Sequence, residues 1–131
     1  MLGNVAPLDQ TVVADLEAGI GTLTRLAEKT VDAVLIVVEP TPKSLEVGSR
    51  AAALAAEKSL GRVIVVANRV RDEKDLATMR ATFGDVEMIS VPDDPAIAAA
   101  DREGVAPLDA SPDAPAVRAL VALGESLLEG T

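Results

Sequence analysis

The sequence predicts an α/β fold, with a mostly parallel sheet of about four strands and helices on both faces. Short runs rich in Val and Ile alternate along the chain with longer segments rich in Ala and Leu, which is the order of elements in parallel sheets. The Val- and Ile-rich runs are apolar at nearly every position, as expected of strands that are covered on both faces. Each run ends at a polar or proline-containing turn. We therefore expect a single α/β domain at residues 11–131, preceded by an irregular lead-in at residues 1–10.

The predicted strands are the apolar runs at residues 11–14, 31–38, 62–67 and 86–91. The run at 31–38 (VDAVLIVV) is the strongest and has the composition of an inner parallel strand. The run Thr11–Ala14 is short and ends at Asp15. Right-handed crossovers place the carboxyl ends of parallel strands at one edge of the sheet. We therefore expect the residues that follow the runs to meet at that edge.

Helices are expected between the strands, at about residues 19–29, 42–60, 72–83, 95–103 and 112–128. Four of these helices begin with N-cap or N1 residues, at Thr41-Pro42, Asp72, Asp94-Pro95 and Ser111-Pro112. Glycines follow the middle three helices, at positions 61, 84 and 104. In the last helix we expect one apolar stripe, made of Val117, Leu120, Val121, Leu127 and Leu128.

Composition excludes several classes of site. The 131 residues carry a formal net charge of -9 and have a pI near 4.4, which disfavours nucleic acid and anionic membrane surfaces as partners. The chain has no Cys and no His, and so it can form neither a thiolate zinc site nor a Ser-His-Asp triad. No signal peptide is evident, and no apolar run approaches the roughly 20 residues that span a bilayer. We expect a cytoplasmic protein.

The residues expected at the carboxyl edge of the sheet form an unusually polar set. Ligands of open α/β sheets bind outside the carboxyl ends of the strands, so this set is a candidate ligand site. The alternative is that strand ends are polar in general and that acids there cap helices. Both interpretations stay open for each member. The set comprises Asp15, Glu17, Glu39, Asn68, Arg69 and residues 92–94.

Four segments carry a resemblance to a known family. They are DLEAGI from Asp15, VVEPTPKSL from Val37, VANRV from Val66 and VPDDPAIAAADREGVAPLD from Val91. In this order they resemble the second half of MinD/ParA-type P-loop ATPases, and most of all the CooC-like branch associated with nickel insertion into carbon monoxide dehydrogenase. The similarity covers residues 11–128. It implies a partial version of that family's Rossmann-like, three-layer domain.

The resemblance also implies roles for several residues. Asp15 resembles the Walker B acid that binds Mg²⁺ through water, and residues 17–19 (Glu-Ala-Gly) resemble the switch II turn that senses the γ-phosphate. Asn68 resembles the asparagine whose amide reads the edge of adenine, to which an amide offers both a donor and an acceptor. The positions that resemble the base-binding part of the family's site are Asn68, Arg69, Pro92 and Asp94.

The sequence departs from that family at the phosphate site. A P-loop ends in Gly-Lys-Ser/Thr, and no Gly-Lys pair occurs in the 131 residues. Gly21-Thr22 stands where Glu-His is common, Asp93 stands where an aromatic residue is common, and the nickel-associated cysteines have no counterpart. We therefore expect weak ATP binding by this chain alone. ATP and Mg²⁺ would be cofactors only if another chain supplies the P-loop.

The resemblance also predicts a gap in the sheet. In that family the P-loop strand lies between the Walker B strand and the strand that follows it here. Without it, the runs at 11–14 and 31–38 would flank an empty lane of about 9.6 Å, twice the usual spacing of strands. Because an unpaired strand edge promotes pairing with another chain, we expect a homodimer or a partner chain that fills the missing central strand.

Three hypotheses for the function follow. The main one is a truncated nucleotide-binding-domain protein that lacks a Walker A motif, is inactive as an ATPase alone, and acts as an interaction or assembly module. The alternative is the C-terminal half of a split ATPase, which binds and hydrolyses ATP when another chain supplies the P-loop. The third is a remnant that folds without a present role.

Overall fold

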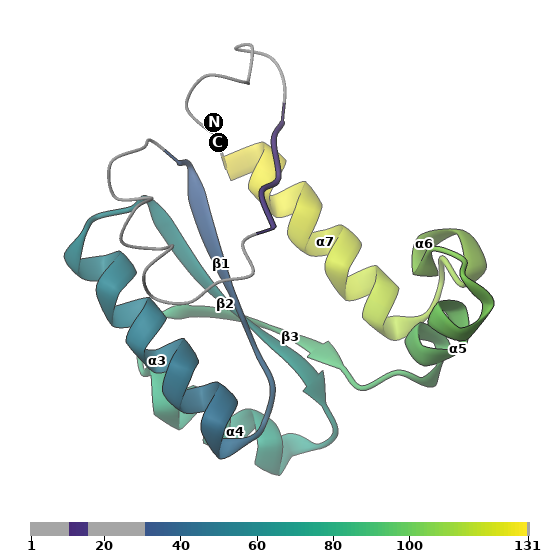
Figure 1. The fold of residues 1–131 in the computed structure, drawn as a ribbon, viewed down its shortest axis with the longest axis horizontal. Helices are drawn as coiled ribbons and strands as arrows, with labels where there is room; N and C mark the ends of the chain where they lie inside the picture. The colour runs from purple at the N-terminus through teal and green to yellow at the C-terminus, as the bar shows by residue number, and fades with distance from the viewer. Residues whose placement is uncertain (1–10, 16–30, 131) are drawn as a thin grey trace.

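A computed structural model of the chain describes residues 11–15 and 31–130. Its elements are β1 (Ala33–Val38), α3 (Pro42–Glu57), β2 (Arg62–Val70), α4 (Glu73–Phe83), β3 (Glu87–Pro92), α5 (Pro95–Glu103), α6 (Pro107–Ala110) and α7 (Pro115–Gly130) (Figure 1). The predicted helix at 19–29 lies outside the described residues. In the described part of the chain, no helix is long and apolar enough to cross a membrane.

The described strands form a parallel sheet in the order β1-β2-β3. This confirms the α/β class, but the sheet formed by residues 31–130 has three strands, whereas about four were predicted. The prediction of a strand at Thr11–Ala14 was wrong, because these residues have irregular backbone and Val13 is 86% exposed. An extended segment becomes a strand only through hydrogen bonds to a neighbour, and none of the described strands pairs with this segment. The apolar composition of Thr11–Ala14 was therefore not sufficient to predict a strand.

Helices α3 and α4 cover one face of the sheet. Their apolar side chains interlock with those of β1 and β2 that point to this face, and Phe83, the only aromatic residue of the sequence, packs among them. Helix α3 approaches β1 closely at Gly48, where an added Cβ would collide with Val38. The buried cluster comprises Ile36, Val38, Leu45, Ala52, Val65, Ala67, Met79 and Phe83.

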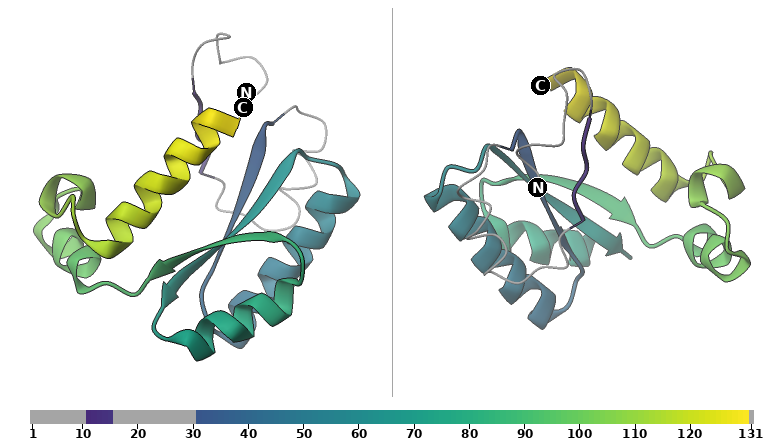
Figure 2. Two further views of the ribbon diagram at one scale, coloured as in Figure 1. Left: turned by 180° about the vertical axis from the view of Figure 1, so that it is seen from behind. Right: turned by 45° about the horizontal axis from the view of Figure 1, so that its top comes forward.

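Helix α7 covers the opposite face, but only over β2 and β3. The cluster beneath it contains Ile64, Val66, Val91, Ala116 and Leu123. Figure 2 shows α7 on the other side of the strands from α3 and α4. The prediction of helices on both faces is therefore confirmed, although the second layer does not extend over β1.

The predicted helix starts are confirmed at three helices. The side chains of Thr41, Asp72 and Asp94 accept hydrogen bonds from backbone N–H groups in the first turns of α3, α4 and α5. The end of α3 was predicted about three residues too late, since the helix stops at Glu57. Gly61 instead shapes the turn into β2: its φ is +105°, and an added Cβ would lie 2.7 Å from the Val31 carbonyl oxygen.

The last helix differs from its prediction in two ways. It begins at Pro115 rather than Pro112, and the short helix α6 precedes it. The single apolar stripe was also wrong. Val117 is buried and Leu127 is half-buried, whereas the remaining three members are 41–63% exposed: Leu120, Val121 and Leu128.

Candidate functional site

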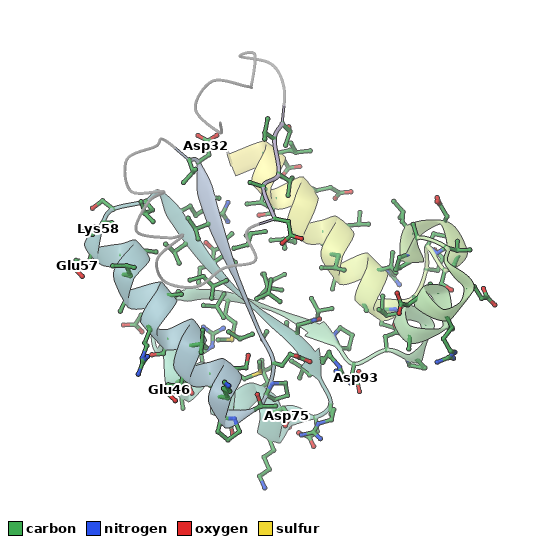
Figure 3. All side chains as sticks on the ribbon, in the orientation of Figure 1. Asp32, Glu46, Glu57, Lys58, Asp75 and Asp93 are labelled. Atoms are coloured by element: carbon green, nitrogen blue, oxygen red, sulfur yellow. The ribbon has the colours of Figure 1, made fainter. Side chains whose placement is uncertain are left out.

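The carboxyl ends of the three strands meet at one edge, as the sequence predicts. This edge brings together Glu39 after β1, Asn68 and Arg69 in the last part of β2, and Asp93 after β3. Figure 3 shows Asp93 just beyond β3, whereas Asp32 lies at the opposite end of β1. Strand β2 continues to Val70, three residues beyond its predicted end. Asn68 and Arg69 therefore belong to the strand itself and not to the turn after it.

Arg69 ties the ends of β1 and β3 to β2. Its guanidinium donates to the Glu39 carboxylate at 3.0 Å and lies 3.5 Å from that of Asp93. These hydrogen bonds, with Glu39 first, raise the pKa of Arg69. All three groups are largely exposed, so water and salt screen the attraction. The sequence signal for this cluster is the opposite charge of residues at neighbouring strand ends, Glu39 and Asp93 on either side of Arg69.

The backbone of Arg69 has an unusual conformation. Its φ is +59°, in the left-handed region, and the β2–β3 register is shifted between Ala67 and Val70. A bulge of this kind redirects side chains at a strand end. It allows Arg69 to reach the carboxylates on either side. The position of the Arg69 guanidinium therefore depends on a backbone irregularity that the residue pattern of β2 does not predict.

Asn68 is half-buried at the same edge. No hydrogen bond joins its side-chain amide to another of the described residues, although the backbone on either side pairs within the sheet. An amide can donate and accept at once. Within the described part of the chain, the amide of Asn68 is therefore without a hydrogen-bond partner, next in sequence to Arg69 of the Glu39–Arg69–Asp93 cluster.

Asp94 has a structural role at this edge. Its two carboxylate oxygens accept hydrogen bonds of 3.0 Å from the N–H of Ala96 in α5 and the N–H of Ala116 in α7. The bond from Ala116, followed by that from Ala96, lowers the pKa of Asp94. The carboxylate of Asp94 thus caps two helices. This agrees with the alternative that acids at the strand ends cap helices. Pro92 ends β3 opposite Val70.

The remaining predicted residues are not assembled into a site by the described part of the chain. Asp15 is exposed on irregular backbone. Glu17, Ala18 and Gly19 lie outside the described residues. Among residues 11–15 and 31–130, no group of three or more Asp or Glu side chains is placed to hold a metal ion.

Comparison with known proteins gives three informative similarities. The chain is 31% identical over 104 residues to the carbon monoxide dehydrogenase accessory protein CooC of Rhodospirillum rubrum, a match that covers 79% of this chain and 40% of CooC. It is 43% identical over 65 residues to the uncharacterized ATP-binding protein MJ0823 of Methanocaldococcus jannaschii, covering 50% of this chain and 25% of that protein. No protein-family model matches the sequence.

The chain is also similar, over a longer range, to a second protein of the same archaeon. The uncharacterized ATP-binding protein MJ0547 is 29% identical over 133 residues, which covers 98% of this chain and 50% of that protein. The matches thus span at most half the length of these relatives. Together, the names of the relatives and the parallel α/β sheet support a relationship of this chain to the P-loop ATPases.

Proposed function

We propose that this chain is a nucleotide-binding-domain relative that acts as an assembly module and does not hydrolyse ATP by itself. The observation that carries the proposal is the exposure of apolar side chains on β1. This strand reads AVLIVV and has the composition of an interior strand, yet Leu35 is 39% and Val37 is 62% exposed. A strand that has the composition of a buried strand but exposes apolar side chains supports association with another polypeptide.

The carboxyl edge supports the second part of the proposal. Arg69 is engaged by Glu39 and Asp93, and both oxygens of Asp94 cap helices. The printed sequence has no Gly-Lys-Ser/Thr loop to bind phosphates. A net charge of -9 adds long-range repulsion toward a nucleotide triphosphate.

Titration calorimetry of the isolated chain with ATP and Mg²⁺ tests this proposal. We expect no binding heat at micromolar ATP and no phosphate release. A micromolar Kd for ATP, or turnover by the purified chain, would contradict it. The Asn68→Ala variant serves as the control, because residual binding that uses the predicted base contact would decrease in it.

A split ATPase is the second candidate, and the amide of Asn68 favours it. This side chain is half-buried and makes no hydrogen bond to the described residues, so its donor and acceptor are available to a ligand there. In this candidate Asn68 and Arg69 contact the base, Pro92 and Asp94 position the loop over it, and Asp15 holds Mg²⁺ through water. A polypeptide that carries the Gly-Lys-Ser/Thr loop would complete the site. ATP binding that appears only in the presence of such a polypeptide, and decreases in Asn68→Ala, would establish this candidate.

A further inference from the structure

We propose that the outer edge of β3 and the adjacent flank of α7 form a docking surface for a second copy of this chain. In the pair, β3 lies antiparallel to its symmetry mate, and the two α7 helices pack against each other. The inference rests on the proposed assembly role and names one partner for it. It concerns the edge of the described sheet opposite β1 and requires no nucleotide. The surface, which we name the β3–α7 edge, consists of Met88, Ile89, Ser90, Ala119, Ala122 and Ser126.

A groove separates β3 from α7 along this edge. Ile89 and Ser90 line it from the sheet, and Ala119, Ala122 and Ser126 line it from the helix. The small side chains of Ala122 and Ser126 are exposed, which leaves room for another helix to approach α7 closely on this flank. Residues 11–15 run between α7 and β1, on the other flank of the helix (Figures 1 and 2).

The outer edge of β3 presents backbone groups for pairing. The N–H of Asp93 donates to the Val70 carbonyl of β2, and successive residues of a strand direct their backbone groups to alternate sides. Pro92, Ser90 and Met88 therefore point their backbone groups away from β2. In the described sheet no strand lies beside them. Because proline has no N–H, pairing along this edge is limited to the residues before Pro92.

A two-fold axis at Ile89 brings the edges of two copies together. Antiparallel pairing about this residue places Met88 opposite Ser90 of the second copy, and each such pair exchanges two hydrogen bonds. Ile89 then faces its symmetry mate in a non-hydrogen-bonded position, where side chains lie closest. Glu87 faces Val91 of the second copy, so that like charges do not meet. The pairing therefore joins the two described sheets into one.

The same axis brings the two α7 helices to packing distance. Helix α7 packs on β2 and β3, so its axis lies above the space between these strands. A two-fold axis perpendicular to the sheet keeps both α7 helices on the same face. With strands about 4.8 Å apart, the two helices would be about 9.6 Å apart, within the roughly 8–10 Å of packed helices. Strand pairing and helix packing thus satisfy one symmetry operation.

Charges on α7 make this flank complementary to itself. Arg118, Ala122, Glu125 and Glu129 follow one another at helical spacing and are exposed. When two α7 helices cross antiparallel at Ala122, Arg118 of one copy lies beside Glu125 and Glu129 of the other. Within the described part of the chain, none of these three charged side chains forms an ion pair. A second copy therefore supplies a partner of opposite charge for each of them.

The formal net charge of -9 opposes the association of two copies. At physiological ionic strength the Debye length is about 8 Å, so charges farther than this from the interface are largely screened. The contacts of Arg118 with the two glutamates act at shorter range, where screening is weaker. Local complementarity of α7 therefore acts against a reduced long-range repulsion.

The association state of the full chain provides the first test. Sedimentation velocity without nucleotide should show a species of twice the 13.4 kDa chain mass at micromolar concentration. Hydrogen exchange followed by NMR should show slower exchange at the amides of Met88 and Ser90 in the dimer than in the diluted monomer. These two amides point to the outer edge of β3, so their protection locates the contact.

Exchange of the charges on α7 provides the second test. Arg118→Glu, and the double variant Glu125→Lys with Glu129→Lys, should each raise the Kd of the dimer at least tenfold, because like charges would meet. A mixture of these two variants should form a heterodimer, because each altered charge then faces its opposite. The matched control is Arg102→Glu, which makes the same charge change at an exposed position of α5 and should leave the Kd unchanged.

The contrary outcomes are distinct. A monomer at high micromolar concentration would overturn the proposal, as would a dimer that Arg118→Glu leaves unchanged. Added protection confined to residues 33–38 would also overturn it, because the copies would then meet at β1. If Arg118→Glu fails to fold, Ala122→Glu places a charge at the exposed centre of the helix crossing and should weaken the dimer at least tenfold. ATP binding by the isolated chain would contradict the proposed function alone, since no nucleotide enters these experiments.

Discussion

Val37 lies beside Val66 in the parallel sheet, and both side chains point to the face that carries α7, yet they differ in exposure from 62% to 3%. Neighbouring valines in one sheet thus have opposite environments. The difference arises because α7 packs over β2 and β3 and ends its coverage before β1. Substitutions at Val37 and Val66 can therefore be compared to measure how much packing against α7 contributes to the free energy of unfolding.

Truncation of the two valines is expected to have unequal effects. Val66→Ala removes buried methyl groups and should lower the free energy of unfolding by about 2 kcal/mol. Val37→Ala should change it by less than about 0.5 kcal/mol in the isolated chain. Urea denaturation followed by circular dichroism measures both. Equal losses would mean that β1 is covered in solution by the chain itself or by a second copy.

Alanine at Gly48 should destabilise the packing of α3 on β1. Its Cβ would collide with Val38 and lie 3.2 Å from the Phe83 ring, and overpacking of this kind costs about 1–3 kcal/mol. Gly124 in α7 has no atom within 4 Å of an added Cβ, so Gly124→Ala should be neutral or stabilising by up to about 1 kcal/mol. Thermal unfolding of the two variants compares them. A stabilised Gly48→Ala variant would show that α3 can shift away from the sheet.

Stability should fall in acid as Asp75 and Asp94 are protonated. Arg71 lowers the pKa of Asp75 through side-chain and backbone hydrogen bonds, and the N–H groups of Ala116 and Ala96 lower that of Asp94. A carboxyl group whose folded pKa is depressed stabilises the fold above its unfolded pKa of about 4, and this contribution disappears as pH falls through the folded value. The Tm should therefore be constant near neutral pH and decrease below about pH 4.

The Asp94→Ala variant isolates one part of this acid dependence. It should lower the Tm by about 5 °C at pH 7, because one helix loses its N-cap and a second loses a backbone contact. The difference from wild type should shrink as pH decreases below about 4. Asp101→Ala is the matched control, since Asp101 is an exposed acid of α5. A constant difference at all pH values would mean that the carboxylate charge does not matter.

Glycine at position 69 should be tolerated better than alanine. Both substitutions remove the ion pairs to Glu39 and Asp93, but only glycine adopts the φ of +59° without strain. We expect Arg69→Gly to have a Tm several degrees above that of Arg69→Ala. The same Tm for both variants would indicate that the bulge of β2 is remodelled when the arginine is lost.

Local signals in the sequence predicted the local structure well. Thr41, Asp72 and Asp94 cap their helices because a cap requires only a side chain and the next few N–H groups. The strands at 31–38, 62–67 and 86–91 were found from continuous apolar runs, with boundary errors of at most three residues. These features depend on near neighbours in the chain.

Several features that depend on distant partners were not predicted. Thr11–Ala14 has the composition of a strand but no described strand beside it, and the stripe of α7 is divided because the helix covers only part of the sheet. The Glu39–Arg69–Asp93 cluster requires three strand ends and a bulge to come together. The sequence placed these residues at one edge, but no spacing within one segment encodes the bulge that lets Arg69 reach both carboxylates.

The two apolar clusters on opposite faces of the sheet have a consequence for how the molecule opens. They share the backbone of β2 but no side chain, and α7 is joined to the end of β3 through the carboxylate of Asp94. Such an arrangement divides a fold into separate cooperative units. We therefore expect α7 to detach as one unit before α3, α4 and the sheet unfold, so that its amides report a lower opening free energy than those of β2.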